Sequence, residues 1–359
     1  MAGLRETRQF LLMAYQDDMI DDEDFAFLYD INRSTNPDFP YWTYQPFDLD
    51  KMDDSECWNE FRFLKSDVFR LCDALQMPDY IRTYNRMRVC GVEALCIFLR
   101  RFSYPIRYAD MMHRFGGRPV PELCVITNHV MDFIYEKWKH LLDDFNLPFM
   151  QPTDLEDYCR AIHAKGAFLD SCFGFVDGTL RPISRPGRDQ NTVYNGHKKT
   201  HGIKFQSVVV PNGLIAHMYG PVEGKRHDVR MLAMSNLLPK LQLHAHNTLG
   251  NPLCIYGDPA YQIQVHLQAP FRNVNLTPLQ QAFNTSMSSV RVSVEWLFGD
   301  IVNWFKFIDF KKQLQLYLSP IGKMYLVCAI LTNSRTCLYG NLTSSYFNCE
   351  PPSLEEYFV

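Results

Sequence analysis

Apolar residues recur every three to four positions between residues 56 and 139, and this spacing predicts a helical region. Three long helices are predicted for WNEFRFLKSDVFRLCDALQM, VCGVEALCIFLRRFS and ELCVITNHVMDFIYEKW. A shorter helix, PIRYADMMHRFG, precedes the last of these, and its two closing glycines favour a turn. A short helix, a turn and a second helix are typical of a helix-turn-helix. An ordinary helical bundle explains the pattern equally well.

The pattern changes to strands and helices after about residue 150. Two short strands around an Asp-Gly turn are predicted for CFGFVDGTLRPIS, and two more around Pro-Asn-Gly for GIKFQSVVVPNGLIAHMYGP. A helix, the strand NPLCIYGD and a long helix, SMSSVRVSVEWLFGDIVNWFKFIDF, follow. Three strands, a helix, a strand and a helix form the order of an α/β domain of the ribonuclease-H-like, retroviral-integrase-like class.

These patterns divide the chain into four expected parts. Prolines and asparagines interrupt any periodicity near the N-terminus, where an acidic, irregular extension is expected. The four parts are the extension (1–50), an all-α, helix-turn-helix-like domain (51–150), the ribonuclease-H-like domain (151–340) and a C-terminal tail (341–359).

The charge of the chain is segregated, so its net value of −4 says little about its partners. Acidic residues gather near the N-terminus, where Asp17 to Asp24 contain six of them. Between Arg181 and Lys204, six lysines and arginines stand against a single acid, Asp189. This local basic stripe is compatible with a nucleic-acid partner.

The eleven cysteines are scattered, odd in number and form no CxxC pair. We therefore expect reduced, mostly buried thiols in an intracellular protein, with no disulfide framework or zinc site. The longest apolar run, Met324 to Leu331, is far shorter than the roughly 20 residues of a membrane span. No membrane association is expected.

Three carboxylates are candidates for a metal-binding catalytic site. Asp177 and Asp258 each follow an apolar strand, so neighbouring strands would bring them to one sheet edge. Glu295 lies about 120° from the centre of the apolar stripe of the last long helix, on its flank. An Asp-Gly step is also an ordinary hairpin turn, and any solvated glutamate would lie off the stripe. Together, however, three carboxylates suit magnesium. Two such ions about 4 Å apart can promote phosphodiester cleavage.

Five motifs in a fixed order carry a resemblance to a known family: FVDGT, YNGHKKTHGIKFQSVVV, GKRHDVRML, YGDPAYQ and SSVRVSVEWLFG. Together they resemble the PIF/Harbinger branch of DDE transposases, which includes the Harbinger transposase-derived nucleases, over about residues 56–340. The resemblance implies catalytic and metal-binding roles for Asp177, Asp258 and Glu295, with Mg²⁺ or Mn²⁺, two ions, as cofactor. Two departures concern DNA contacts: Lys225-Arg226 stands where the family often has Ser-x, and Asp300 begins a segment that is often basic.

The resemblance implies a divalent-metal-dependent DNA endonuclease or transposase that retains strand transfer if the full reaction is kept. Arg181, Lys198, Lys199 and Arg291 are the predicted DNA contacts, although each could be an ordinary surface charge and Arg291 could pair with Glu295. His227-Asp228 is a candidate fourth element, for which a hydrogen bond at a helix start is the favoured role.

The resemblance also implies a separate Myb-like DNA-binding protein that aids nuclear import. We therefore expect a nuclear protein that stays in the cytoplasm without this partner, and homo-oligomers are compatible with the family. The alternative is a domesticated, non-catalytic DNA- or chromatin-binding adaptor that keeps the transposase fold. The fold also allows a ribonuclease, which the motifs do not favour.

Overall fold

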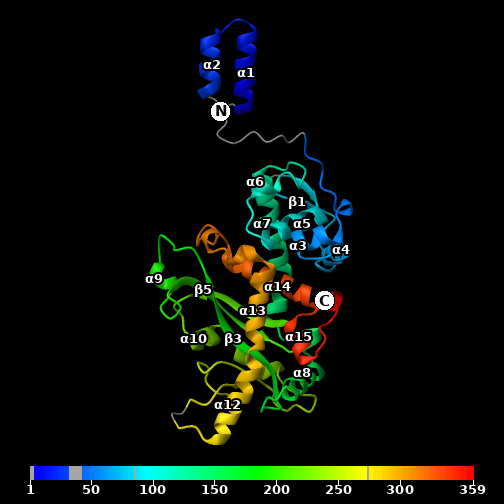
Figure 1. The fold of residues 1–359 in the computed structure, drawn as a ribbon, viewed down its shortest axis with the longest axis vertical. Helices are drawn as coiled ribbons and strands as arrows, with labels where there is room; N and C mark the ends of the chain where they lie inside the picture. The colour runs from blue at the N-terminus through cyan, green and yellow to red at the C-terminus, as the bar shows by residue number, and fades with distance from the viewer. Residues whose placement is uncertain (1–3, 32–42, 85, 273–274) are drawn as a thin grey trace. The chain divides into compact units, whose positions relative to one another are not determined.

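The computed structural model describes residues 4–31, 43–84, 86–272 and 275–359 (Figure 1). Contacts divide the chain into two compact units, one of residues 1–46 with 113–118 and one of residues 47–112 with 119–359. Within the first unit, α1 (Leu4–Gln16) and α2 (Asp22–Ile31) form a helical pair. Tyr15 stacks near Phe25 and donates a hydrogen bond to Asp22, at 2.7 Å.

The prediction of an irregular extension is therefore wrong for the two helical segments of the first unit. The acidic run that suggested a solvated segment supplies the first turn of α2, with Asp22, Glu23 and Asp24. Negative side chains stabilise this end of a helix because the unpaired N–H groups there carry partial positive charge.

The second unit begins with the helical region. Its helices are α3 (Asp54–Phe61), α4 (Lys65–Ala74), α5 (Gly91–Ser103), α6 (Tyr108–Met111) and α7 (Val120–Trp138). The first predicted helix is broken at Arg62, whose backbone is left-handed with φ 68°. A short hairpin of β1 (Tyr80–Arg82) and β2 (Arg88–Cys90) shows that the expected all-α composition is wrong in this detail.

Helix α7 would be the DNA-reading helix of a helix-turn-helix. Its exposed side chains include Asp132, which accepts a 2.7 Å bond from Lys323, and Glu136, 3.8 Å from the same ammonium. Acidic side chains on this face repel phosphates, so the face gives no support to DNA reading by α7. The helix-turn-helix stays a hypothesis.

A mixed sheet forms the centre of the second unit. The strands β3 (Cys172–Pro182), β5 (Thr200–Val209) and β6 (Ile215–Glu223) are consecutive and antiparallel, and β7 (Cys254–Tyr256) and β8 (Leu267–Gln268) continue the sheet in parallel. The short β4 (Tyr194–Asn195) pairs with the start of β5. The order is β6-β5-β3-β7-β8, a mixed α/β sheet consistent with the predicted ribonuclease-H-like fold.

One predicted feature of this sheet is wrong. Asp177-Gly178 is not a turn between two strands but lies in the middle of β3, where it pairs with Ser207 and Gln206 of β5. The predicted Pro-Asn-Gly turn between β5 and β6 is present.

Helices pack on this sheet: α8 (Pro152–Ala164) and α13 (Ser293–Trp304) contact β3, α10 (Asp228–Met234) contacts β5, and α14 (Ile321–Tyr339) contacts β6 (Figure 1). The predicted long final helix is two helices, because a turn at Val292 separates α13 from α12 (Pro278–Arg291). Helix α12 also begins earlier than predicted, at a capping box formed by Thr277 and Gln280. The remaining helices are α9 (Gln190–Val193), α11 (Leu237–His244), α15 (Leu342–Phe347) and α16 (Leu354–Tyr357).

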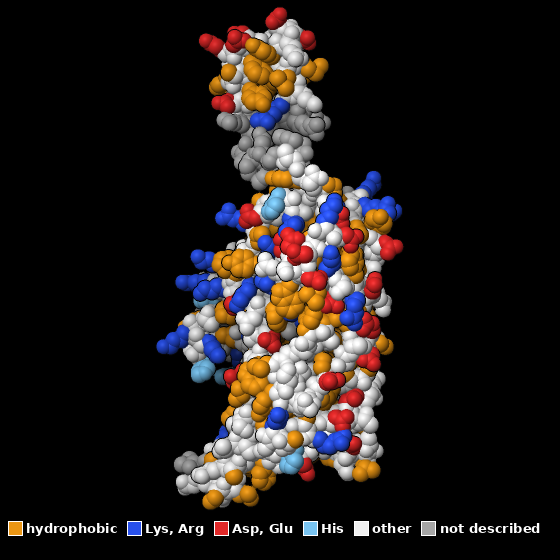
Figure 2. Space-filling view, turned by 45° about the vertical axis from the view of Figure 1, so that its right-hand side comes forward, with side chains coloured by type: hydrophobic (Ala, Val, Ile, Leu, Met, Phe, Trp, Pro, Cys, Tyr) orange, Lys and Arg blue, Asp and Glu red, His pale blue; other side chains and the backbone are white. Residues whose placement is uncertain are grey.

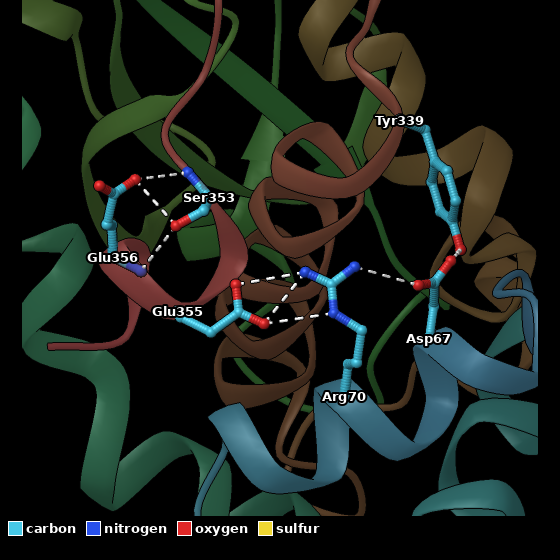
Figure 3. A network of polar contacts seen from close by, with 6 residues as sticks. All are labelled: Asp67, Arg70, Tyr339, Ser353, Glu355 and Glu356. Carbon is cyan, nitrogen blue, oxygen red and sulfur yellow. Dashed lines mark hydrogen bonds and ion pairs between the residues drawn. The ribbon is translucent and has the colours of Figure 1, made fainter.

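An ion pair and a hydrogen bond connect the C-terminal part of the chain to the helical region (Figure 3). Arg70 of α4 lies 3.0 Å from Glu355 of α16, and Tyr339 at the end of α14 donates a 2.7 Å hydrogen bond to Asp67 of α4. Leu354 and Tyr357 are buried. The predicted tail is thus an integral part of the second unit.

One expectation from composition, that of reduced and mostly buried thiols, agrees with the described structure. All eleven cysteines are free, and most are buried. The described residues contain no helix that is long and apolar enough to cross a membrane.

Candidate active site

Asp177, within β3, and Asp258, two residues after the end of β7, lie at equivalent places along the chain. Strands β3 and β7 are parallel, and Phe175 is opposite Tyr256. Each aspartate stands two residues beyond its member of this pair, so the two residues are neighbours across the strands. Backbone groups hold both side chains: Gly178 donates its N–H to Asp177 Oδ1 at 2.8 Å, and Ala260 donates to Asp258 Oδ1 at 2.7 Å.

Both aspartates line a pocket of about 650 Å³, large enough for a substrate group. Its walls come from β3, β4, β5 and the start of α10. A third acid, Asp228, shares the pocket with several cations, which are Lys198, Lys204, Lys225 and Arg226. In Figure 2, lysines and arginines gather along one side of the molecule at the height of α9 and β5. The pocket therefore combines ligands for a hard cation with groups that attract a polyanion.

The carboxylate of Asp177 is held in an unfavourable environment. Its side chain is 19% exposed, and this burial is the main cause of its raised pKa. Arg291, whose Nη1 lies 3.5 Å from Asp177 Oδ2, lowers the pKa, while the charges of Asp258 and Glu295 raise it further. Charges of one sign around a buried carboxylate favour the binding of a cation among them.

Glu295 is in the first turn of α13 and is exposed. Its charge contributes to the raised pKa of Asp177, but Glu295 is not among the residues that line the pocket. Within the described ranges no three His, Cys, Asp or Glu side chains are close enough together to hold a metal ion. The structure thus brings the two aspartates together at the pocket and leaves the glutamate outside its lining. The two aspartates supply oxygen ligands of the kind that a divalent cation prefers.

The four predicted DNA contacts have different surroundings. Lys198 is exposed and lines the pocket, and Lys199 is exposed with a left-handed backbone, φ 49°. Arg181 instead donates a 2.7 Å bond to Thr179 and lies 5.2 Å above the buried ring of Tyr325. The guanidinium of Arg181 is therefore directed into the protein.

Arg291 is the fourth predicted contact. It pairs with Asp177, and not with Glu295, the alternative partner that the sequence offered. In this arrangement Arg291 compensates part of the buried negative charge of Asp177.

Comparison with protein families gives one match. Residues 176–333 match the model described as DDE superfamily endonuclease. This segment resembles the DDE endonucleases. It contains Asp177, Asp258 and Glu295, and it supports a DDE-transposase-like family without distinguishing the Harbinger branch. No curated protein and no solved structure matches the chain.

The DDE-like segment holds a charged pair that the sequence did not predict. Lys204 of β5 donates a 2.9 Å hydrogen bond to Asp228 at the start of α10. A side chain at position 178 would come within 2.9 Å of the same Asp228 oxygen, which explains why a glycine follows Asp177. The signal in the sequence was the GKRHD motif, but its partner in GIKF is 24 residues away.

The favoured role of His227-Asp228, a hydrogen bond at the helix start, is confirmed in part: Asp228, the first residue of α10, accepts a hydrogen bond from Lys204, but no side-chain cap forms. His227 occupies the N-cap position of α10 without a side-chain capping bond. Asp228 turns instead to Lys204 and into the pocket.

Proposed function

We propose that this protein is a divalent-metal-dependent DNA endonuclease of the DDE transposase type, from the PIF/Harbinger branch. The observation that carries the proposal is that Asp177 and Asp258, each two residues beyond the paired Phe175 and Tyr256 of parallel strands, line one pocket that also holds lysines. The family match over 176–333 supports the endonuclease part of the proposal.

In this proposal Asp177 and Asp258 hold Mg²⁺ or Mn²⁺, two ions in the full site, and Glu295 completes the set from α13. The bound cations would supply the charge that promotes water attack and stabilises the leaving oxygen. The protein residues have separate roles. Lys198 and Lys225, which are exposed at the pocket, would bind phosphate oxygens of the DNA backbone and orient the strand. Lys204 would contribute charge while Asp228 fixes its position.

The proposal extends to the context of the reaction. A strand transfer by a 3′-hydroxyl would follow cleavage if the full transposase reaction is retained. A separate Myb-like protein would recognise the DNA ends and bring the chain to the nucleus, and a homo-oligomer would hold two ends together.

One observation favours the second candidate, a non-catalytic DNA- or chromatin-binding adaptor. No three metal-binding side chains are assembled in the described part of the chain, and an adaptor would not need them to be. The two functions differ in a simple assay.

The test is nicking of supercoiled DNA in the presence of Mg²⁺ or Mn²⁺, with and without the DNA-binding partner. We expect wild type to nick, and Asp177→Asn, Asp258→Asn and Glu295→Gln to lose at least about a hundredfold in rate, since each removes a charge needed at the transition state. Asp157→Asn, an exposed carboxylate on α8, is the matched control and should nick at the wild-type rate. Absence of metal-dependent nicking by wild type under both conditions would leave the adaptor as the better account.

A further inference from the structure

A second pocket, of about 270 Å³, lies between α3, α13 and α14. Its walls include Trp58, Asp300, Trp304, Arg335 and Tyr339, and none of the proposed catalytic carboxylates lines it. Its volume is just below that of pockets for drug-sized ligands, so it suits a smaller molecule or ion.

Arg335 is the unusual member of this pocket. It is only 4% exposed, and its Nε and Nη1 atoms are buried without a hydrogen-bond partner. Aromatic rings surround its guanidinium, which lies 3.7 Å from the centre of Trp304, 4.7 Å from Trp58 and 5.0 Å from Tyr339. Burial lowers the pKa of Arg335 to about 10, so the group keeps its charge at neutral pH. Stacked rings stabilise the faces of a guanidinium but leave its N–H groups unused.

The other polar groups of the pocket already have partners. Tyr339 donates its hydroxyl to Asp67 and accepts the Leu64 N–H, as part of the network in Figure 3. The hydroxyls of Thr332 and Thr336 donate to carbonyl oxygens within α14. These groups cannot turn to Arg335 without losing bonds.

Asp300 on α13 is the acid that shares the pocket. Its charge raises the pKa of Arg335, yet the described residues contain no ion pair between the two side chains. Burial raises the pKa of Asp300, and Arg335 only partly offsets this. A buried, unpaired cation is costly, and an anion that accepts its N–H groups would relieve the cost.

We propose that this pocket binds a small oxyanion, a phosphate or carboxylate group, against the guanidinium of Arg335. Arginine suits both groups because its planar donors match two oxygens at once. Asp300 would take a proton and donate a hydrogen bond to the same anion. This site is distinct from the proposed metal pocket, and its binding does not depend on nuclease activity.

The test is isothermal titration calorimetry of the full chain with inorganic phosphate and, separately, with acetate. Arg335→Gln should weaken binding at least about tenfold, the loss expected when one charge-assisted hydrogen bond is removed. Asp300→Asn keeps a donor but removes a negative charge, so it should bind the anion as tightly as wild type or more tightly. Whichever of the two anions binds identifies the preferred group.

A control variant separates this site from other cationic surfaces. Arg160→Gln removes an exposed guanidinium on α8, so it should leave the affinity unchanged. The proposal is overturned if wild type binds neither anion at millimolar concentration. It is also overturned if a folded Arg335→Gln protein binds like wild type. If Arg335→Gln does not fold, Asp300→Asn decides, because weaker anion binding by that variant would contradict the proposal.

Discussion

The pair of Lys204 and Asp228 allows a quantitative prediction. Their side chains are 12% and 26% exposed, and the two charged atoms are 2.9 Å apart. At an effective dielectric constant of about 20, the direct attraction at this distance is about 6 kcal/mol. Desolvation of both groups consumes most of it. We therefore expect a net coupling of about 1–3 kcal/mol between the two side chains.

A double-mutant cycle measures this coupling. The free energy of unfolding in urea is determined for wild type, Lys204→Met, Asp228→Asn and the double variant, without divalent metal. The two single variants together should lose more free energy of unfolding than the double variant, because each single variant leaves one buried polar group without its partner. The cycle of Lys323→Met with Asp132→Asn is the matched control: its side chains are 34% and 54% exposed, so its coupling should stay below about 1 kcal/mol. A coupling of Lys204 with Asp228 below about 0.5 kcal/mol would refute the reasoning.

Two further predictions concern the same pocket. Gly178→Ala places a methyl group 2.9 Å from Asp228 Oδ1, so it should lower the free energy of unfolding in urea by about 1–3 kcal/mol. Gly187→Ala is the control: its methyl group would lie in open space, so the free energy of unfolding should be nearly unchanged. Because the pKa of Asp177 is raised in the folded state, the folded protein binds this proton more tightly than the unfolded chain, and this contribution to stability falls as the pH rises from the ordinary aspartate pKa through the raised value. Asp177→Asn should therefore flatten the pH dependence of thermal unfolding above about pH 4 without metal; an unchanged pH profile would show that burial of Asp177 is not costly.

The periodicity of apolar residues predicted much of the fold, because it follows directly from which faces are buried. It located α5 and α7 closely, and it gave the succession of strands that forms the mixed sheet. The apolar pattern did not predict the helix breaks that depend on the backbone conformation of a single residue. The left-handed residue at Arg62 and the turn at Val292 leave no trace in the apolar pattern.

The candidate site was partly predictable for the same reason. The apolar runs before Asp177 and Asp258 predicted that the two carboxylates meet, and the structure brings both into one pocket, although Asp177 lies within β3 and not at its end. The Asp-Gly step led to a wrong prediction of a turn. Gly178 is needed because the side chain of Asp228 packs closely against its backbone. The ion pair of Lys204 with Asp228 forms because β5 packs against α10, and no local sequence pattern predicts that contact.

The network of Figure 3 has a consequence for cutting the chain. Asp67 and Arg70 tie the end of α14 and the C-terminal α16 to the helical region, across more than 270 residues of sequence. A fragment trimmed to the family-matched segment, residues 176–333, would lose these bonds and the partners of the apolar face of α14. The segment that resembles an endonuclease therefore shares its compact unit, and these bonds, with the helices before it and the short C-terminal segment behind it.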